Sequence, residues 1–150
     1  MGVEIWLPLE RWKDQRCFRL RYKVEPEPRP FLTLQPVKVS PDPEWDPRWE
    51  EWHCYLIPLT IDIQDYQQLL AGYFDRVFPT KDPIDGWPMD SLDLCSPNWL
   101  GEEDWRTILT AIRGEMGEAS RRKRKFYDTF LRWLEAALTH TSIIVAEGNQ

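Results

Sequence analysis

The sequence is poor in the residues that most metal sites and disulfide frameworks use. It contains two histidines and three cysteines among 150 residues. Cys17, Cys54 and Cys95 are an odd number at wide spacings, which argues against a disulfide framework and predicts reduced thiols and a cytoplasmic location. The histidines and cysteines do not have the close spacing of a zinc site, so we predict neither a metal nor another cofactor.

Long apolar runs and nucleotide-binding motifs are also missing. No apolar stretch approaches the roughly 20 residues that span a bilayer, and the first residues do not resemble a signal peptide, so we predict no membrane contact. The sequence has no P-loop, no GxGxxG fingerprint and no GxSxG elbow. His53 and Cys54 are adjacent in a predicted strand, where neighbouring side chains point to opposite faces, so they do not form a catalytic dyad. The sequence therefore favours a non-catalytic protein.

The first half of the chain has the alternating pattern of β-strands. Apolar residues at 18, 20, 22 and 24 alternate with Arg19, Arg21 and Lys23, which predicts a strand with one buried and one basic face. Residues 3–9 are its expected hairpin partner. Two further strands are expected at 31–39, which Pro36 interrupts, and at 53–61, where Pro58 indicates an edge, a bulge or a strand end.

The second half has the spacing of amphipathic helices. One helix is expected from Ile63 to Val77, with Asp62 as its N-cap and Pro79 beyond its end. A second is expected from Gly101 to Met116, and a third carries apolar residues from 126 to 138. The apolar run at 143–146 predicts a buried C-terminal strand. We therefore predict a single α+β domain over 1–150, in which about three helices pack on an N-terminal, mostly antiparallel sheet.

Nine tryptophans are more than a core of this size needs. Five of them lie in two predicted loops, 40–52 and 80–100, and four of these rings are expected to be only partly covered. Aromatic rings of this kind are frequent anchors at protein interfaces. The residues predicted to bind a protein partner are Trp45, Trp49, Trp87 and Trp99. The alternative is that these rings form small clusters under the loops.

The second of these loops also contains four aspartates around Gly86. Carboxylate oxygens suit hard cations such as calcium or magnesium, but the spacing does not match an EF-hand. The simpler interpretation is that these residues stabilise turns and cap helices or strands. The aspartates are Asp82, Asp85, Asp90 and Asp93.

Residues 121–125 are five consecutive cations in a chain of net charge −6. Three i,i+4 pairs of opposite charge are expected around them on a helix: Glu118 with Arg122, Arg124 with Asp128, and Asp128 with Arg132. A basic first turn opposes the helix dipole, so helix stability alone does not explain the run. Candidate contacts to phosphate or to an acidic partner are Arg121, Arg124 and Lys125, together with Arg19, Arg21 and Lys23 if the two groups are adjacent.

These observations rank three functions. The first is non-catalytic binding of another protein, as an inhibitor, an immunity-type protein or an adaptor. The second is an accessory RNA- or DNA-binding subunit that uses residues 121–125, although the acidic remainder of the chain would repel phosphate. The third is an enzyme that uses the loop carboxylates. The oligomeric state stays open.

Overall fold

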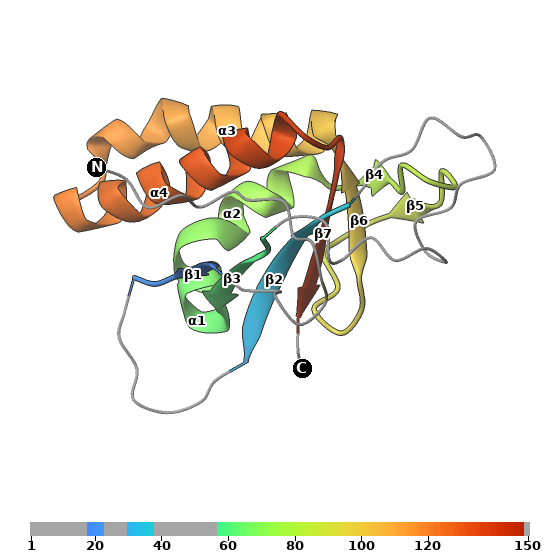
Figure 1. The fold of residues 1–150 in the computed structure, drawn as a ribbon, viewed down its shortest axis with the longest axis horizontal. Coiled ribbons are helices and arrows are strands. Elements are labelled where there is room, and N and C mark those ends of the chain that lie inside the picture. Colours follow the sequence, from blue (N-terminus) through green and yellow to red (C-terminus); the bar gives the residue numbers. More distant parts are fainter. Residues whose placement is uncertain (1–17, 23–29, 38–56, 149–150) are drawn as a thin grey trace.

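We analysed a computed structural model of the chain, which describes residues 18–22, 30–37 and 57–148. Five strands of this part form one mixed sheet in the order β1-β3-β2-β7-β6. Their bounds are Phe18–Leu20 for β1, Phe31–Pro36 for β2, Leu59–Asp62 for β3, Asn98–Gly101 for β6 and Ile143–Gly148 for β7. Helices pack on this sheet, and the C-terminal strand lies inside it (Figure 1). The predicted α+β class is therefore confirmed.

The sheet is mostly antiparallel, as predicted. β2 pairs antiparallel with β3 and β7, and β6 pairs antiparallel with β7, whereas β1 pairs parallel with β3. The predicted hairpin partner at 3–9 lies outside the described residues. Pro36 is the last residue of β2, and Pro58 precedes β3, so both prolines lie at strand ends.

The helical segment predicted between residues 63 and 77 is present, but its winding is not uniform. It consists of α1 (Ile63–Asp65), a π-helical turn (Tyr66–Leu70), α2 (Ala71–Phe74) and a 3₁₀ turn (Asp75–Val77). Asp62 is the N-cap, as predicted, and its Oδ1 accepts a hydrogen bond from the amide of Gln64 at 2.8 Å.

The two longer helices also lie where the apolar spacing predicts them. α3 spans Glu102–Glu115 and buries Trp105, Ile108, Leu109 and Ile112. After a 3₁₀ turn (Met116–Glu118), α4 spans Arg121–Leu138, and its N-cap Ser120 accepts a hydrogen bond from the amide of Lys123. The two helices lie side by side over the sheet (Figure 1).

The main core lies between these helices and one face of the sheet. Buried rings meet at its centre, where Phe74 contacts Trp105 edge to face with ring centroids 5.4 Å apart. The indole of Trp105 donates to the carbonyls of Leu100 and Ile144, and that of Trp133 donates to the carbonyl of Ile57. These bonds satisfy buried polar groups that would otherwise destabilise the core.

A smaller apolar cluster covers part of the other face of the sheet. Trp99 and Val145 are register partners on β6 and β7, and they pack with Val37 and Ile143. The partly buried side chain of Ile84 also packs against this cluster. The sheet is thus apolar on both faces where β2, β7 and β6 meet.

The prediction that residues 80–100 form a loop is partly wrong. β4 (Thr80–Lys81) and β5 (Pro88–Met89) form an antiparallel hairpin, and residues 98–100 belong to β6. The turn between β5 and β6 is closed by Asn98. Its side-chain amide nitrogen donates to the carbonyls of Asp93, Ser96 and Ala146. One side chain therefore joins this turn to β7.

Among the helices of the described residues, none combines the length and the apolar composition that a bilayer-spanning helix needs.

Candidate functional site

The β4–β5 hairpin carries an exposed tryptophan at its tip. Trp87 has 72% of its surface exposed, and it is the large hydrophobic residue that stands out as exposed in the described part of the chain. The turn is well defined, because the amide of Asp82 donates to the carbonyl of Trp87 and the amide of Gly86 donates to the carbonyl of Asp82, each at 2.8 Å. Gly86 has a φ of +76°, which favours glycine. The ring is thus presented on a fixed backbone.

The loop aspartates bind the backbone of their own turns. Asp82 Oδ1 accepts from the amide of Ile84 at 2.7 Å, and Asp85 Oδ1 accepts from the amide of Trp87 at 2.8 Å. Asp93 accepts from the amide of Cys95 and from the hydroxyl of Ser96, and the hydroxyl is the main cause that lowers the pKa of Asp93. These contacts are typical of turn-forming aspartates.

The described residues contain no group of three or more histidine, cysteine or acidic side chains that would hold a metal ion. Cys95 is exposed, and His140 is exposed just beyond the end of α4. His53, Cys17 and Cys54 lie outside the described residues.

The four tryptophans predicted as partner contacts do not share one environment. Trp87 is exposed as predicted, whereas Trp99 is only 9% exposed. The expectation that Trp99 lies in a loop is wrong, because it occupies β6 and its ring packs on Val145 and Ile143. Trp45 and Trp49 lie outside the described residues, so their role stays a prediction.

The basic run begins at the first residue of α4. Arg121, Arg122, Arg124 and Lys125 are exposed, and Lys123 is partly covered. Among the described residues, Arg121, Arg124 and Lys125 form no ion pair. Within the described part of the chain, these three cations therefore have no ion-pair partner near the positive end of a helix dipole, where like charge is unfavourable.

Of the three predicted i,i+4 pairs, the described residues form one. Arg132 pairs with Asp128 at 2.9 Å. The predicted pair of Glu118 with Arg122 is wrong, because Glu118 lies in the 3₁₀ turn before Ser120 and is not part of α4. Arg124 does not pair with Asp128, because the carboxylate of Asp128 binds Arg132 instead.

Arg122 instead contacts β1. Its guanidinium carbon lies 4.5 Å from the centre of the Tyr22 ring, and its Nη2 donates to the Tyr22 carbonyl oxygen. The amide of Tyr22 donates to Asp65 Oδ2 at 2.8 Å, and the ring meets that of Phe126 edge to face at 6.3 Å. The end of β1 is thus held by a buried carboxylate from α1, and by an arginine and a ring from α4.

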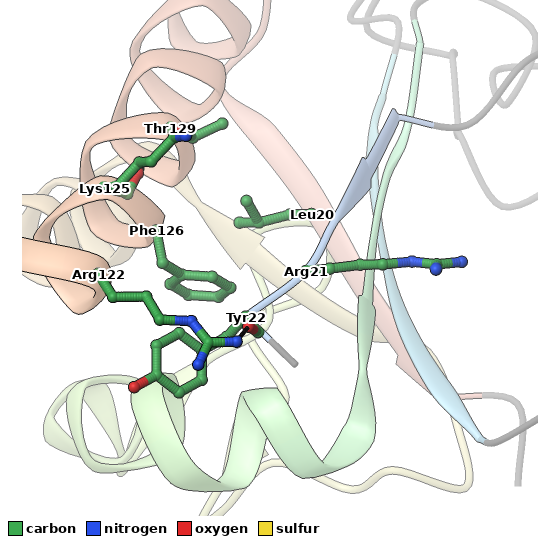
Figure 2. Close-up of a pocket in the computed structure, with 7 residues that line it drawn as sticks. All are labelled: Leu20, Arg21, Tyr22, Arg122, Lys125, Phe126 and Thr129. Carbon is green, nitrogen blue, oxygen red and sulfur yellow. Dashed lines mark hydrogen bonds between the residues drawn. The ribbon is translucent and has the colours of Figure 1, made fainter. Parts of the chain in front are cut away.

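These contacts surround a pocket between β1 and α4, which we call the β1–α4 pocket. It has a volume of about 240 Å³. Figure 2 shows Arg122, Lys125 and Thr129 on α4 at one side, with the Phe126 ring and Leu20 behind them and Tyr22 next to Arg122. An apolar floor with cations at its rim suits a ligand that has both an apolar and an acidic group.

The charged end of Arg21 does not join the cations of α4. Arg21 is among the residues that line the pocket, but its side chain points away from α4, whereas Leu20 and Tyr22 face this helix (Figure 2). Alternation along a strand puts Arg19 on the same side as Arg21, and both are exposed. Lys23 lies outside the described residues. The two basic groups are close in space but face different sides of the sheet.

Sequence reasoning missed Tyr22, Phe126 and Thr129 as parts of a site. Tyr22 and Phe126 were counted among the apolar residues of a strand and a helix, and both do bury apolar surface. Their contribution to a pocket depends on the contact between β1 and α4, which no local pattern encodes. The sequence feature that indicates a site here is the run of five cations at 121–125, which helix stability alone does not explain.

Tyr127 of α4 forms a small aromatic cluster with Tyr73 of α2. The hydroxyl of Tyr127 donates to the carbonyl of Leu69 at 2.9 Å, and its ring meets that of Tyr73 edge to face. Burial and the neighbouring Tyr73 raise the pKa of Tyr127 to about 12. Tyr73 also stacks under Arg76, which pairs with Glu115 at 2.5 Å. These contacts join the helices to one another.

Comparison with known proteins gives no relative. No protein-family model matches the chain, and neither the curated proteins nor the solved structures contain a significant match. Function is therefore argued from the residues of this chain alone.

Proposed function

We propose that this protein binds another protein without catalysing a reaction, as an inhibitor, an immunity-type protein or an adaptor would. The observation that carries the proposal is Trp87, which is 72% exposed at the tip of the β4–β5 hairpin. Exposing a large ring to water is unfavourable, and burying it against a partner recovers that free energy. Tryptophan is also among the residues that contribute most at protein interfaces.

The turn around Trp87 supports this proposal. Hydrogen bonds within residues 82–87 fix the backbone on which the ring sits. A partner that binds the ring therefore loses little conformational freedom in the hairpin, which favours affinity. The neighbouring carboxylates of Asp85 and Asp90 are exposed, so a partner with a hydrophobic slot and a basic rim fits this surface.

The second candidate function is binding of RNA or DNA through residues 121–125. Its supporting observation is that Arg121, Arg124 and Lys125 are exposed and have no ion pair among the described residues. Arg21, which was expected to extend this surface, points to the other side of β1 (Figure 2). We rank this function below protein binding for that reason.

The test is recovery of a partner from extracts of the native host. We expect tagged wild-type protein to retain a partner that Trp87→Ala loses, because interface anchors of this kind contribute about 2 kcal/mol or more, roughly a thirtyfold change in Kd. Ser91→Ala, an exposed substitution in the same segment that leaves the carboxylates in place, is the control and should retain the partner. Equal recovery by wild-type protein and by Trp87→Ala would overturn the proposed interface.

A further inference from the structure

The β1–α4 pocket lies at a different part of the molecule from Trp87. Figure 1 places β1 and the start of α4 at one end of the sheet and the β4–β5 hairpin at the other. We propose that this pocket binds an acidic peptide segment, with one apolar side chain inserted over Phe126 and flanking carboxylates held by Lys125 and by Arg121. This inference goes beyond the proposed function, because it concerns a second surface and does not depend on Trp87.

The pocket has the size of a side-chain site. Its volume of about 240 Å³ lies below the roughly 300–1,000 Å³ of typical small-molecule sites. Its floor is apolar, since Leu20 and Phe126 line it, and Figure 2 shows the Phe126 ring between α4 and Leu20. A nucleotide or a drug-sized molecule is too large for this space, whereas one aliphatic side chain fits it.

The charge at the rim selects an acidic ligand. Lys125 lines the pocket, and Arg121 precedes it by one helical turn on the same side of α4. Their charges are not neutralised by any ion pair among the described residues, and they destabilise the first turn of α4. Carboxylates placed at this rim relieve that repulsion and also interact favourably with the helix N-terminus.

Three observations favour a peptide over a nucleic acid. Residues 121–125 rise only about 6 Å along the helix axis, whereas grooves for single strands follow roughly 4–16 nucleotides. The ring of Tyr22 lies under the guanidinium of Arg122 at 4.5 Å, so this face of the ring is not open for a base to stack on. The chain as a whole is acidic, with a net charge of −6, and repels a long polyanion more than a short segment.

The experiment measures binding of a fluorescent peptide to the full chain by anisotropy at low salt. The probe is a short peptide of glutamate and aspartate around a single leucine. A matched peptide of glutamine and asparagine around the same leucine reports any uncharged binding, and single-stranded oligothymidylate tests the nucleic-acid alternative. We expect the acidic peptide to bind more tightly than both comparison probes.

Variants of α4 locate the binding site. The double substitution Arg121→Gln and Lys125→Gln should weaken peptide binding severalfold, since exposed ion pairs each contribute modestly. The matched double substitution Arg124→Gln and Arg132→Gln removes the same charge from α4 outside the pocket, and should change the affinity by less than about twofold. Neither change touches the apolar face of α4, so both variants should fold.

A second pair of variants tests the apolar floor without changing charge. Thr129 lines the pocket, and its hydroxyl donates to the carbonyl of Lys125, as the hydroxyl of Thr107 donates to that of Glu103 on α3. Thr129→Met should occupy the pocket and weaken peptide binding severalfold, whereas the matched Thr107→Met should leave it unchanged. Trp87→Ala should also leave it unchanged, which separates this inference from the proposed function.

Several outcomes would overturn the inference. One is failure of the acidic peptide to bind more tightly than the glutamine and asparagine peptide. Another is tighter binding of oligothymidylate, which would assign the surface to nucleic acid. Equal losses in the two double variants would mean that only net charge matters, and unchanged binding in Thr129→Met would mean that the pocket is not used.

Discussion

The β4–β5 hairpin and the β1–α4 pocket both present exposed side chains, but they are attached to the molecule in different ways. No residue from 82 to 88 is buried, and the turn is held by hydrogen bonds among its own residues and by the packing of Ile84 on the small cluster around Trp99. The pocket, in contrast, is built from Leu20 and Phe126 of the main core and from Asp65, which is 1% exposed. Substitutions at the two ends should therefore affect stability very differently.

This difference bears on how each surface can be studied. A surface that rests on its own turn can be altered without disturbing the fold, so loss of binding reports the interface directly. A surface that rests on the core cannot, because removing Tyr22 or Phe126 also removes packing. Only the exposed side chains at the edge of the pocket, Arg121, Lys125 and Thr129, can be changed without removing core packing.

The largest effect is expected at the pocket end, from Asp65→Ala. This change leaves the amide of Tyr22 without the carboxylate that accepts it at 2.8 Å. Loss of a buried hydrogen bond to a charged group costs about 1.5–3 kcal/mol of unfolding free energy. Urea unfolding measures this loss, and the peptide affinity should fall as well because the end of β1 is released.

Asp62→Ala is the matched control for this prediction. It removes the N-cap of the same helix, which costs about 1 kcal/mol, but Asp62 bonds to Gln64 and not to β1. Peptide affinity should therefore survive in Asp62→Ala. If both variants lose the same stability and keep the same peptide affinity, Asp65 does not hold the end of β1 in place. The shape of the pocket then does not depend on this buried residue.

A smaller effect is expected from Tyr127→Phe, and it should depend on pH. At neutral pH the variant loses the hydrogen bond to the carbonyl of Leu69 and should be less stable by about 1 kcal/mol. The folded pKa of Tyr127 is raised from 10.0 to about 12. A raised pKa contributes stability that is present below the unfolded value and is lost as the pH rises through the folded value.

The deficit of Tyr127→Phe should therefore shrink between pH 10 and about 12, because only the wild-type protein carries the hydroxyl that ionises there. Unfolding in urea at a series of alkaline pH values measures this, with phenolate absorbance as a second readout. Stability curves that stay parallel across this range would show that Tyr127 ionises as readily in the folded protein as in the unfolded chain.

Much of the fold follows from local sequence patterns. The buried face of α3, from Trp105 to Ile112, and the N-cap Asp62 lie where helical spacing and capping chemistry predict them. The run at 143–146 predicts a buried strand, and β7 lies between two other strands. These features depend on residues that are near one another in the chain.

The errors concern features that depend on distant residues. β6 is only four residues long and follows many turn-forming residues, so its pattern resembles a loop. Trp99 is buried because β6 pairs with β7, which lies more than forty residues away in the chain. The pocket likewise depends on contacts between Tyr22 and Arg122, which are 100 positions apart. Local spacing carries no information on such pairings.

The smallest effect on global stability is expected at the hairpin end, from Gly86→Ala. A Cβ at this position meets no atom within 4 Å, so the cost comes from the backbone alone, whose φ is +76°. Placing alanine in this region costs about 1–2 kcal/mol. The hairpin tip has no buried residue, so it should open before the core unfolds, and the global loss is limited to the free energy of that opening.

We therefore expect hydrogen exchange at the amide of Asp82 to rise about tenfold in Gly86→Ala, while the free energy of global unfolding falls by less than about 0.5 kcal/mol. Gly114→Ala is the matched control, because Gly114 lies in α3 with open space around it and its replacement should raise global stability by about 0.5–1 kcal/mol. A global loss of the full 1–2 kcal/mol in Gly86→Ala would mean that the hairpin unfolds together with the core. The contrast between the two ends would then disappear, and Trp87→Ala would need the same stability controls as substitutions in the pocket.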